Sequence, residues 1–334
     1  MKFYKMLFFN FLIFGTLLSI SSYSWFSMWL GLEINMLSFI PLMSDKGNIF
    51  LSESSMKYFI IQSVSSMVVL MSALIMIYCN EFIIPLMNSI ILIMNSALLM
   101  KLGSAPFHFW FPEVMEGMNW INCLILLSWQ KIAPFILIMN NKMNINFLVF
   151  IILFCLLISM IMSFNQTSLR KILTFSSINN IAWMLCSIQC SYSIWLIYFL
   201  MYSLMMLSLI LLFNYLNLNY FNQIFILSSK NFMIKLTLIL NFLSLGGLPP
   251  FIGFFPKWIV IYNMDLINLE FLSFMMIMFS LVILYVYIRM MFSSFTLMST
   301  EMKLELNFNL QFFIFFNFMF LISLSFMTLL FNLV

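Results

Sequence analysis

The chain alternates long apolar runs with short polar breaks, and one such run extends from residue 145 to residue 164. A helix needs about 20 mostly apolar residues to cross a bilayer, whereas the strands of a membrane β-barrel are short and alternate apolar with polar residues. The pattern therefore predicts an all-α polytopic membrane protein. About eleven transmembrane helices are expected, at residues 4–22, 25–43, 56–79, 83–115, 120–139, 146–164, 170–189, 192–214, 231–262, 270–292 and 311–333.

The connections between these runs are short and polar, the longest being 44–55, 215–230 and 293–310. None is long enough for a separate soluble domain, so we expect residues 1–334 to form a single membrane domain. The first run has no small-residue cleavage site and leads directly into the second. It is therefore not expected to be a removable signal peptide.

Two of the predicted spans are interrupted by glycine and proline. The sequence Gly-Ser-Ala-Pro at 103–106 breaks the fourth span, and Gly-Gly-Leu-Pro-Pro at 246–250 breaks the ninth. Proline removes a helical hydrogen-bond donor and clashes with the preceding turn. We therefore predict two broken helices.

The two breaks align with each other without a gap. At an offset of 144 residues, Gly103, Pro106, Phe107, Phe111 and Pro112 fall on Gly247, Pro250, Phe251, Phe255 and Pro256. The breaks lie five spans apart, and successive units of five spans face opposite ways. The sequence thus predicts two inverted five-helix repeats, about 1–140 and about 145–292, and an additional C-terminal helix at 311–333. Inverted repeats with broken helices are typical of machinery that translocates ions and solutes.

Composition narrows the class of protein further. Hydrophobic residues make up 64% of the chain and charged residues only 7%, with a mean hydropathy of +1.11. A soluble domain is nearer half apolar and a quarter charged. The formal net charge is only +4, without a basic cluster suited to phosphates. These values exclude a soluble enzyme, a disordered chain and a nucleic-acid binder.

The basic residues are unevenly distributed between the two sides of the membrane. The side of the membrane opposite to the N-terminus receives only Lys142. Lys101, Lys131 and Lys257 belong to neither side, because they fall inside spans. The N-terminal side receives Lys2, Lys5, Lys46, Lys57, Arg170, Lys171, Lys230, Lys235, Arg289 and Lys303. Basic residues gather on the inner side of a membrane. We therefore expect the N-terminus on that side and, with an odd number of spans, the C-terminus on the other.

Several charged residues fall within the predicted spans, most of them near span ends, and four are the candidates for buried charges. Glu33 is about 12 Å into the second span and Lys131 about 16 Å into the fifth, at 1.5 Å per residue. Lys101 directly precedes the first break, where free carbonyl groups would favour a cation. Lys257 follows Pro256 beyond the second break. A charge at the bilayer centre costs roughly 2.5–3.5 kcal/mol, so these residues are the candidate functional site.

Their chemistry suits proton transfer. Burial disfavours the charged form of an amine, and a nearby carboxylate favours it. Moving that carboxylate would therefore load or release a proton. Two other interpretations stay open: a structural ion pair for Glu33, and a Lys257 that extends to the membrane surface. Polar residues that could order water between the charges are Gln62, Ser65, Ser66, Asn95, Ser128, Gln130, Ser176, Ser177 and Asn180.

Cysteine and histidine give no indication of a cofactor site. The five cysteines form no Cys-x-x-Cys motif, and His108 is the only histidine. We therefore expect neither a metal centre nor an iron–sulfur cluster on this chain.

Several motifs together resemble the subunit 2 family of mitochondrial NADH:ubiquinone oxidoreductase, respiratory complex I. They occur in the family's order, and with matching length and span count the resemblance covers essentially the whole chain. The motifs are Trp-Leu-Gly-Leu-Glu-Ile-Asn-Met-Leu-Ser-Phe-Ile-Pro at 29–41, Lys-Leu-Gly-Ser-Ala-Pro-Phe-His-Phe-Trp-Phe-Pro-Glu at 101–113, Trp-Gln-Lys-Ile-Ala-Pro at 129–134, Leu-Arg-Lys at 169–171, Phe-Ser-Ser-Ile at 175–178, Gly-Gly-Leu-Pro-Pro-Phe at 246–251 and Pro-Lys-Trp at 256–258.

The resemblance implies an antiporter-like, proton-translocating subunit of the complex's membrane arm. It places the chain in the mitochondrial inner membrane, with the N-terminus in the matrix and the C-terminus in the intermembrane space. It implies other membrane-arm subunits, membrane lipids and protons as partners, and no nucleic acid. NADH, flavin, iron–sulfur clusters and ubiquinone would be handled by other subunits, leaving no cofactor here. The chain would thus belong to an enzyme, the proton-translocating NADH:ubiquinone reductase, without a redox centre of its own.

The resemblance also implies roles for the four charged residues. Glu33 matches the family's membrane glutamate, and Lys101 matches its ion-pair lysine. Opening and closing of that pair would control the proton affinity of Lys131, the central lysine. Protons would then pass through water toward Lys257. The family often has histidine where this chain has Asn180, and asparagine does not titrate at neutral pH. A titrating relay is therefore not expected there.

Two alternative functions remain open at this stage. The first is a stand-alone antiporter that exchanges a monovalent cation for a proton, because the inverted-repeat architecture serves both functions. The second is a mainly structural subunit whose buried charges hold its neighbours in register.

Overall fold

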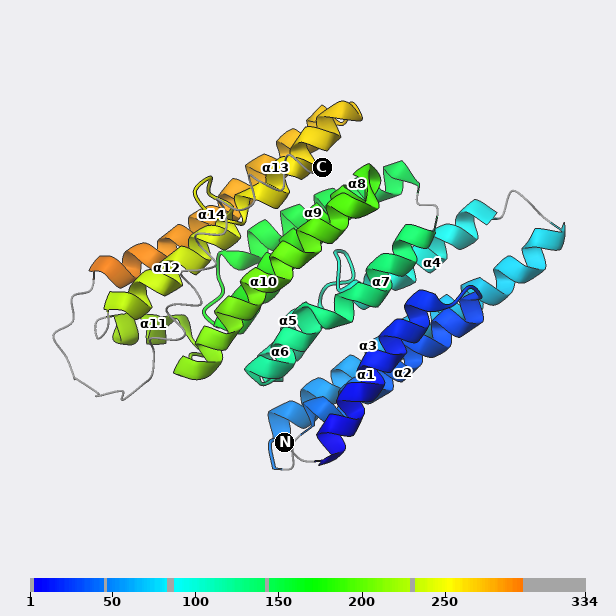
Figure 1. Ribbon diagram of the computed structural model, residues 1–334, viewed down its shortest axis with the longest axis horizontal. Helices are drawn as coiled ribbons and strands as arrows, with labels where there is room; N and C mark the ends of the chain where they lie inside the picture. The colour runs from blue at the N-terminus through cyan, green and yellow to red at the C-terminus, as the bar shows by residue number, and fades with distance from the viewer. Residues whose placement is uncertain (1–2, 45–46, 83–86, 142–143, 229–231, 297–334) are drawn as a thin grey trace. The chain divides into compact units, whose positions relative to one another are not determined.

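A computed structural model describes residues 3–44, 47–82, 87–141, 144–228 and 232–296. Within these ranges the regular structure is helical, apart from an isolated β-bridge between Ser168 and Tyr220. The helices labelled in Figure 1 are α1 (Phe3–Ser21), α2 (Trp25–Met43), α3 (Ile49–Phe82), α4 (Met87–Leu102), α5 (Trp110–Gly117), α6 (Trp120–Leu127), α7 (Trp129–Asn140), α8 (Ile145–Ser163), α9 (Leu169–Cys190), α10 (Tyr192–Leu216), α11 (Phe221–Ser228), α12 (Phe232–Gly246), α13 (Phe254–Leu266) and α14 (Glu270–Thr296).

Most of the predicted spans coincide with helices. The helix α2 occupies the predicted residues, and α1, α8, α9, α10 and α14 begin within one residue of the prediction. Seven segments of the described chain are long and apolar enough to cross a membrane: Phe3–Ser21, Trp25–Met43, Ile49–Tyr78, Trp120–Asn140, Ile145–Ser163, Tyr192–Leu216 and Glu270–Phe292. The protein is therefore a multi-pass helical membrane protein.

The count of eleven spans stays a prediction. The predicted spans at 83–115 and 231–262 are each divided into two shorter helices. The predicted span at 170–189 forms α9, which is not among the seven apolar segments because it carries many polar residues. The predicted C-terminal span at 311–333 lies outside the described residues.

Two segments that were expected to be connections contain helix. The helix α3 begins at Ile49, within the predicted connection 44–55, and packs against α5 with Leu51 and Ser54 buried. The helix α11 lies within the predicted connection 215–230. There the Gln223 side-chain oxygen accepts from the backbone N–H groups of Asn219 and Tyr220, at 2.6 and 3.1 Å. Tertiary packing stabilises the start of α3, and side-chain hydrogen bonds stabilise the start of α11. A prediction from hydropathy includes neither contribution.

The predicted fifth span is also distorted. It forms α6 and α7, which meet at Ser128, where φ is −110° and ψ is −69°. The Ser128 hydroxyl donates to the Leu124 carbonyl at 2.7 Å. Serine side chains that bond back to the preceding turn often bend a helix. The distortion places Lys131 in the first turn of α7.

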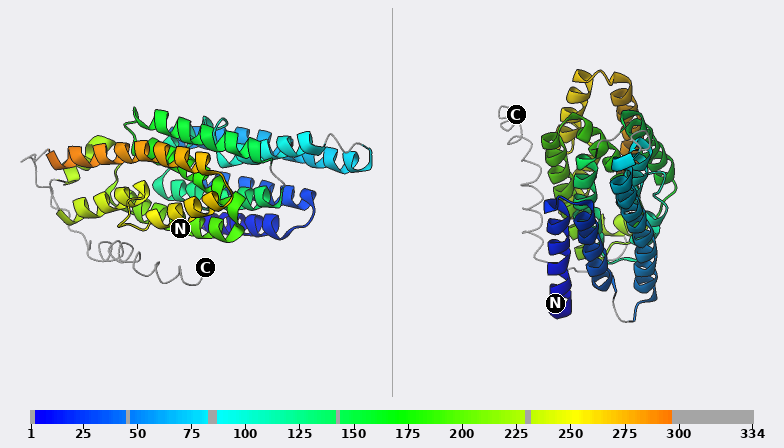
Figure 2. Two further views of the ribbon diagram at one scale, coloured as in Figure 1. Left: turned by 90° about the horizontal axis from the view of Figure 1, so that it is seen from above. Right: turned by 90° about the vertical axis from the view of Figure 1, so that its right-hand side faces the viewer.

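The chain divides into two compact units, Met1–Ile151 and Ile152–Val334. In the first unit, α1 and α2 lie side by side, and α3 packs against α2, α4 and α5 (Figures 1 and 2). In the second unit, α10, α13 and α14 all pack against α9. Many of the side chains of α9 are buried, from Leu169 to Ser187. A polar helix is thus enclosed by apolar ones.

Both predicted helix breaks are present. The helices α4 and α12 end at Leu102 and Gly246, and α5 and α13 begin at Trp110 and Phe254. The ends of α4 and α12 are 144 residues apart, and so are the starts of α5 and α13. This is the offset at which the two breaks align in the sequence. The aligned glycines that follow, Gly103 and Gly247, have φ angles of +73° and +81°, a left-handed conformation that glycine adopts without steric cost.

Candidate functional site

At the first helix break, neutral donors hydrogen-bond to the backbone carbonyl groups at the end of α4. The carbonyl groups at the end of α4 were expected to be free. Instead, the Ser104 hydroxyl donates to the Leu99 carbonyl at 3.0 Å, and the Trp110 indole donates to the Met100 carbonyl at 3.2 Å. The carbonyl of Lys101 itself accepts from the Gln62 side-chain amide at 3.3 Å. These bonds satisfy the backbone of the break without using the Lys101 amine.

Lys101 and Lys131 line the same small cavity. Its volume is about 20 Å³, which is enough for one water molecule. The two lysines are only 8% and 2% exposed, so they lie in the interior of the first unit. The Lys131 amine lies 5.8 Å from the centre of the Phe111 ring, within range of a cation–π interaction. The break after α4 and the bend before α7 thus bring two predicted site residues together.

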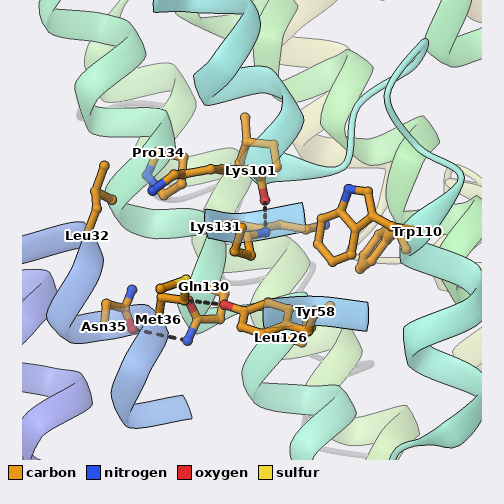
Figure 3. Close-up of a pocket in the computed structure, with 13 residues that line it drawn as sticks. Leu32, Asn35, Met36, Tyr58, Lys101, Trp110, Leu126, Gln130, Lys131 and Pro134 are labelled. Carbon is orange, nitrogen blue, oxygen red and sulfur yellow. Dashed lines mark hydrogen bonds between the residues drawn. The ribbon is translucent and has the colours of Figure 1, made fainter. Parts of the chain in front are cut away.

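One wall of the cavity is a chain of polar side chains from three helices. The Gln130 amide of α7 donates to Asn35 of α2 at 3.1 Å, and the Tyr58 hydroxyl of α3 approaches the Gln130 oxygen at 3.5 Å (Figure 3). Gln130 and Gln62 were among the predicted polar residues, but Asn35 and Tyr58 were not. Asn35 could have been selected from the sequence, because it is a polar residue inside a predicted span, two residues after Glu33. Polar groups inside spans need hydrogen-bond partners.

Glu33 lies close to this cavity without lining it. The side chain is partly buried on α2, and its sequence neighbour Leu32 lines the cavity. In the described ranges, no ion pair of 4 Å or less joins Glu33 to Lys101. The first unit thus holds Glu33 near the cavity that Lys101 and Lys131 line.

Lys257 lies at the break in the second unit. Its amine donates to the Gly246 carbonyl at 2.9 Å, at the end of α12, and lies 5.7 Å from the centre of the Trp183 ring. The side chain is 7% exposed. In this unit the lysine itself occupies the carbonyl end of the broken helix, where the helix dipole favours a cation. This position does not support a Lys257 that extends to the surface.

These features define a class of protein: a multi-pass helical membrane protein with two broken helices and buried lysines beside each break. The family described as "NADH:quinone oxidoreductase/Mrp antiporter, TM" matches residues 22–284. The chain belongs to this NADH:quinone oxidoreductase/Mrp antiporter transmembrane family.

Similar proteins include relatives named NADH-ubiquinone oxidoreductase chain 2. The one from Anopheles gambiae is 50% identical over 303 residues, covering 89% of this chain and 88% of the relative. The one from Locusta migratoria is 43% identical over 302 residues, covering 89% and 87%. High identity over almost the full length of both relatives indicates that the chain matches them as a whole rather than through one shared segment.

Solved structures show a similar fold at low sequence identity. A chain of respiratory complex I from Thermus thermophilus with bound aureothin aligns with a TM-score of 0.85 at 19% identity, over 96% of this chain and 78% of that one. A chain of the Mrp complex from Dietzia sp. aligns with a TM-score of 0.73 at 14% identity, over 84% and 58%. The fold is therefore shared by the two kinds of assembly.

Proposed function

We propose that this chain is the antiporter-like subunit of the membrane arm of NADH:ubiquinone oxidoreductase that translocates protons. The full-length relatives named as chain 2 of that enzyme support the assignment to the complex. The observation that carries proton translocation is the pair of lysines, Lys101 and Lys131, that line one cavity of water-molecule size. A buried amine whose charge is costly can bind and release a proton as its surroundings change.

The four charged residues take different parts in this mechanism. When the Glu33 carboxylate approaches Lys101, it stabilises the ammonium there, and when it withdraws, that stabilisation is lost. Because Lys101 and Lys131 share a cavity, a change of charge at Lys101 changes the electrostatic potential at Lys131. Lys131 then binds or gives up its proton. Lys257 receives protons in the second unit and passes them out of the membrane.

The proposal includes the finer topology. It has eleven transmembrane helices, and the two five-helix repeats are inverted. The equal spacing of the two helix breaks and the division into two compact units near residue 151 support the repeats. The distribution of lysine and arginine supports an N-terminus in the matrix and a C-terminus in the intermembrane space. The chain would lie in the mitochondrial inner membrane among lipids and other membrane-arm subunits.

The energy for translocation would come from redox chemistry in other subunits. NADH, flavin, iron–sulfur clusters and ubiquinone would be bound there, and this chain would carry no redox centre. Its own residues would hold and move protons at carboxylate and amine groups.

A stand-alone cation/proton antiporter is the less well supported alternative. The likeness to the Mrp complex shows the fold alone, at 14% identity, whereas relatives named as chain 2 of the oxidoreductase are up to 50% identical. The two functions differ in a simple observable, because only the oxidoreductase subunit needs a large assembly.

Native gel separation of mildly solubilised membranes tests the assignment. We expect mass spectrometry to find this chain at stoichiometric level in a large band with NADH dehydrogenase activity. Finding the chain only in a small band without that activity would favour the free antiporter. Reconstitution of the small species in vesicles, followed by measurement of cation-driven proton exchange, would then decide between the two.

A further inference from the structure

Two side-chain amides join α2 to the helices on either side of the bend at Ser128. On α6, the Asn122 amide donates to the Leu42 carbonyl at 3.1 Å, near the end of α2. On α7, the Gln130 amide donates to the Asn35 side-chain oxygen, also at 3.1 Å. Asn122 and Asn35 are only 9% and 3% exposed. Both bonds therefore lie in the interior of the first unit, where the loss of a partner is costly.

The two bonds serve different groups. The last four carbonyl groups of a helix have no partner within the helix, so the Asn122 bond is explained by the need to satisfy the end of α2. The Gln130 bond satisfies no backbone group, and an apolar pair of similar shape would remove the need for it. Its position is informative, because Gln130 directly precedes Lys131 and Asn35 follows Glu33 by two residues. The bond thus joins the segments that carry two of the candidate proton-transfer residues.

Gln130 also contacts a third helix. The Tyr58 hydroxyl of α3 approaches the Gln130 oxygen at 3.5 Å, and Tyr58 is 2% exposed. An amide donates through its nitrogen and accepts through its oxygen, so Gln130 is directed toward α2 on one side and α3 on the other (Figure 3). Because α2 and α3 pack against each other, Gln130 holds the start of α7 where these two helices meet.

The first turn of α7 needs such contacts because the bend weakens its backbone connection to α6. The Lys131 N–H donates to the Ser128 carbonyl at 3.3 Å, spanning three residues instead of the four of a regular α-helix. The backbone therefore does not fix α7 as a straight continuation of α6. Side-chain contacts contribute to the direction of α7, and Gln130 makes its contacts in the same turn as Lys131.

We propose that Gln130 is a positioning residue for Lys131, and that its bond to Asn35 transmits displacements of α2 to the first turn of α7. The inference rests on the proposed function. A shift of α2 would move Gln130 with Asn35, and the bend at Ser128 allows the first turn of α7 to follow. The Lys131 amine would then move in a cavity of about 20 Å³, where a displacement of about 1 Å changes its geometry for proton transfer. The position of Lys131 is thereby linked to the helix that carries Glu33.

The first test exchanges the lengths of the two amide side chains. Asn35→Gln and Gln130→Asn each change the span of the bond by one methylene group, whereas the double variant restores the total length. We expect each single variant to lower proton uptake per assembled complex by about tenfold, and the double variant to recover most of the wild-type uptake. Uptake would be measured in reconstituted complex, with the assembled amount taken from native gels.

Asn122→Leu is the matched control. It removes an amide bond of the same length to the same helix, outside the cavity wall. The variant leaves the Leu42 carbonyl unpaired, so the amount of assembled complex is expected to fall. Proton uptake per assembled complex should equal that of the wild type. An equal loss of uptake in Asn122→Leu and Gln130→Asn would show that any broken contact to α2 has this effect, which overturns the positioning role.

The second test asks whether Gln130 and Glu33 act through the same lysine. Gln130→Met keeps a side chain of similar size and removes its polar atoms, and Glu33→Gln removes the carboxylate. If both residues act on Lys131, the double variant should pump no less than the single variant that pumps less. Independent effects would instead multiply, because the free energies of independent changes add. Multiplied losses, which a merely structural Gln130 would produce, contradict the inference. If Gln130→Met does not assemble, Gln130→Asn takes its place in this comparison.

The outcomes separate this inference from the proposed function. Normal uptake in Asn35→Gln and Gln130→Asn, with uptake lost in Lys131→Ala, overturns the positioning role and leaves the proposed function standing. Normal uptake in all variants, Lys131→Ala included, overturns both. A double exchange variant that pumps no better than its single variants also overturns the positioning role, since the bond itself would then not be what matters.

Discussion

Lys131→Ala is expected to stop proton translocation through this subunit, and coupled NADH oxidation should fall by about tenfold or more. The side chain is 2% exposed and lines the cavity that Lys101 also reaches. Alanine leaves neither an amine to bind the proton nor a donor for water in the cavity. Proton uptake by proteoliposomes, measured beside NADH oxidation, tests the expectation.

Lys57→Ala is the matched control for this variant. Lys57 also belongs to the first unit, but its side chain is 40% exposed and pairs with Glu53 and Glu113 at 3.0 and 2.9 Å. Exposed ion pairs contribute little to stability, about 0–1 kcal/mol. Pumping should therefore be unchanged in Lys57→Ala. Equal loss in both variants would indicate a general effect of removing a lysine.

Lys131→Arg separates a proton carrier from a structural charge. Arginine stays protonated at any pH that the protein experiences, so it preserves the charge but cannot release a proton. If Lys131 carries protons, the arginine variant should assemble and fail to pump. Full pumping in Lys131→Arg would contradict the proposed mechanism and favour a structural role for the buried charges.

Hydropathy predicted the apolar helices well because lipid contact imposes a simple composition on them. The helix α2 matches its prediction at both ends, and the two glycine–proline breaks are present where the residues placed them. Both depend on local chemistry: a run of apolar side chains, or a missing backbone donor. Lys101 and Lys131, which the sequence places inside spans, are 8% and 2% exposed, whereas the sequence left the depth of Lys257 open and the structure buries it to 7% exposed.

The features that were missed depend on contacts between distant residues. Asn35 and Tyr58 belong to the cavity because Gln130, on another helix, lies between them. Nor could the sequence indicate that Gln62 and Trp110 would satisfy the carbonyl groups at the end of α4. Tyr198 was overlooked for the same reason, since its hydroxyl donates to Asn180 on another helix.

The second large effect is expected from Gly31→Ala, through the packing of α1 on α2. A Cβ atom at Gly31 would lie 2.6 Å from the backbone nitrogen of Ser19, and one at Gly15 would lie 2.8 Å from the backbone nitrogen of Asn35. Backbone atoms cannot move aside as a flexible side chain can, so the two helices must separate. Overpacking of this kind costs typically about 1–3 kcal/mol.

The separation would also reach the cavity, because Asn35 follows Gly31 by one turn on α2 and accepts the hydrogen bond from Gln130. We therefore expect Gly31→Ala to lower both the amount of assembled complex and the pumping of what assembles. Quantitative native gels and proton uptake per assembled complex measure the two effects. Leu37→Ala, on the same helix but 54% exposed, is the control and should affect neither. Wild-type assembly and pumping in Gly31→Ala would show that α1 and α2 tolerate a wider spacing, and that the Asn35–Gln130 bond does not depend on their contact.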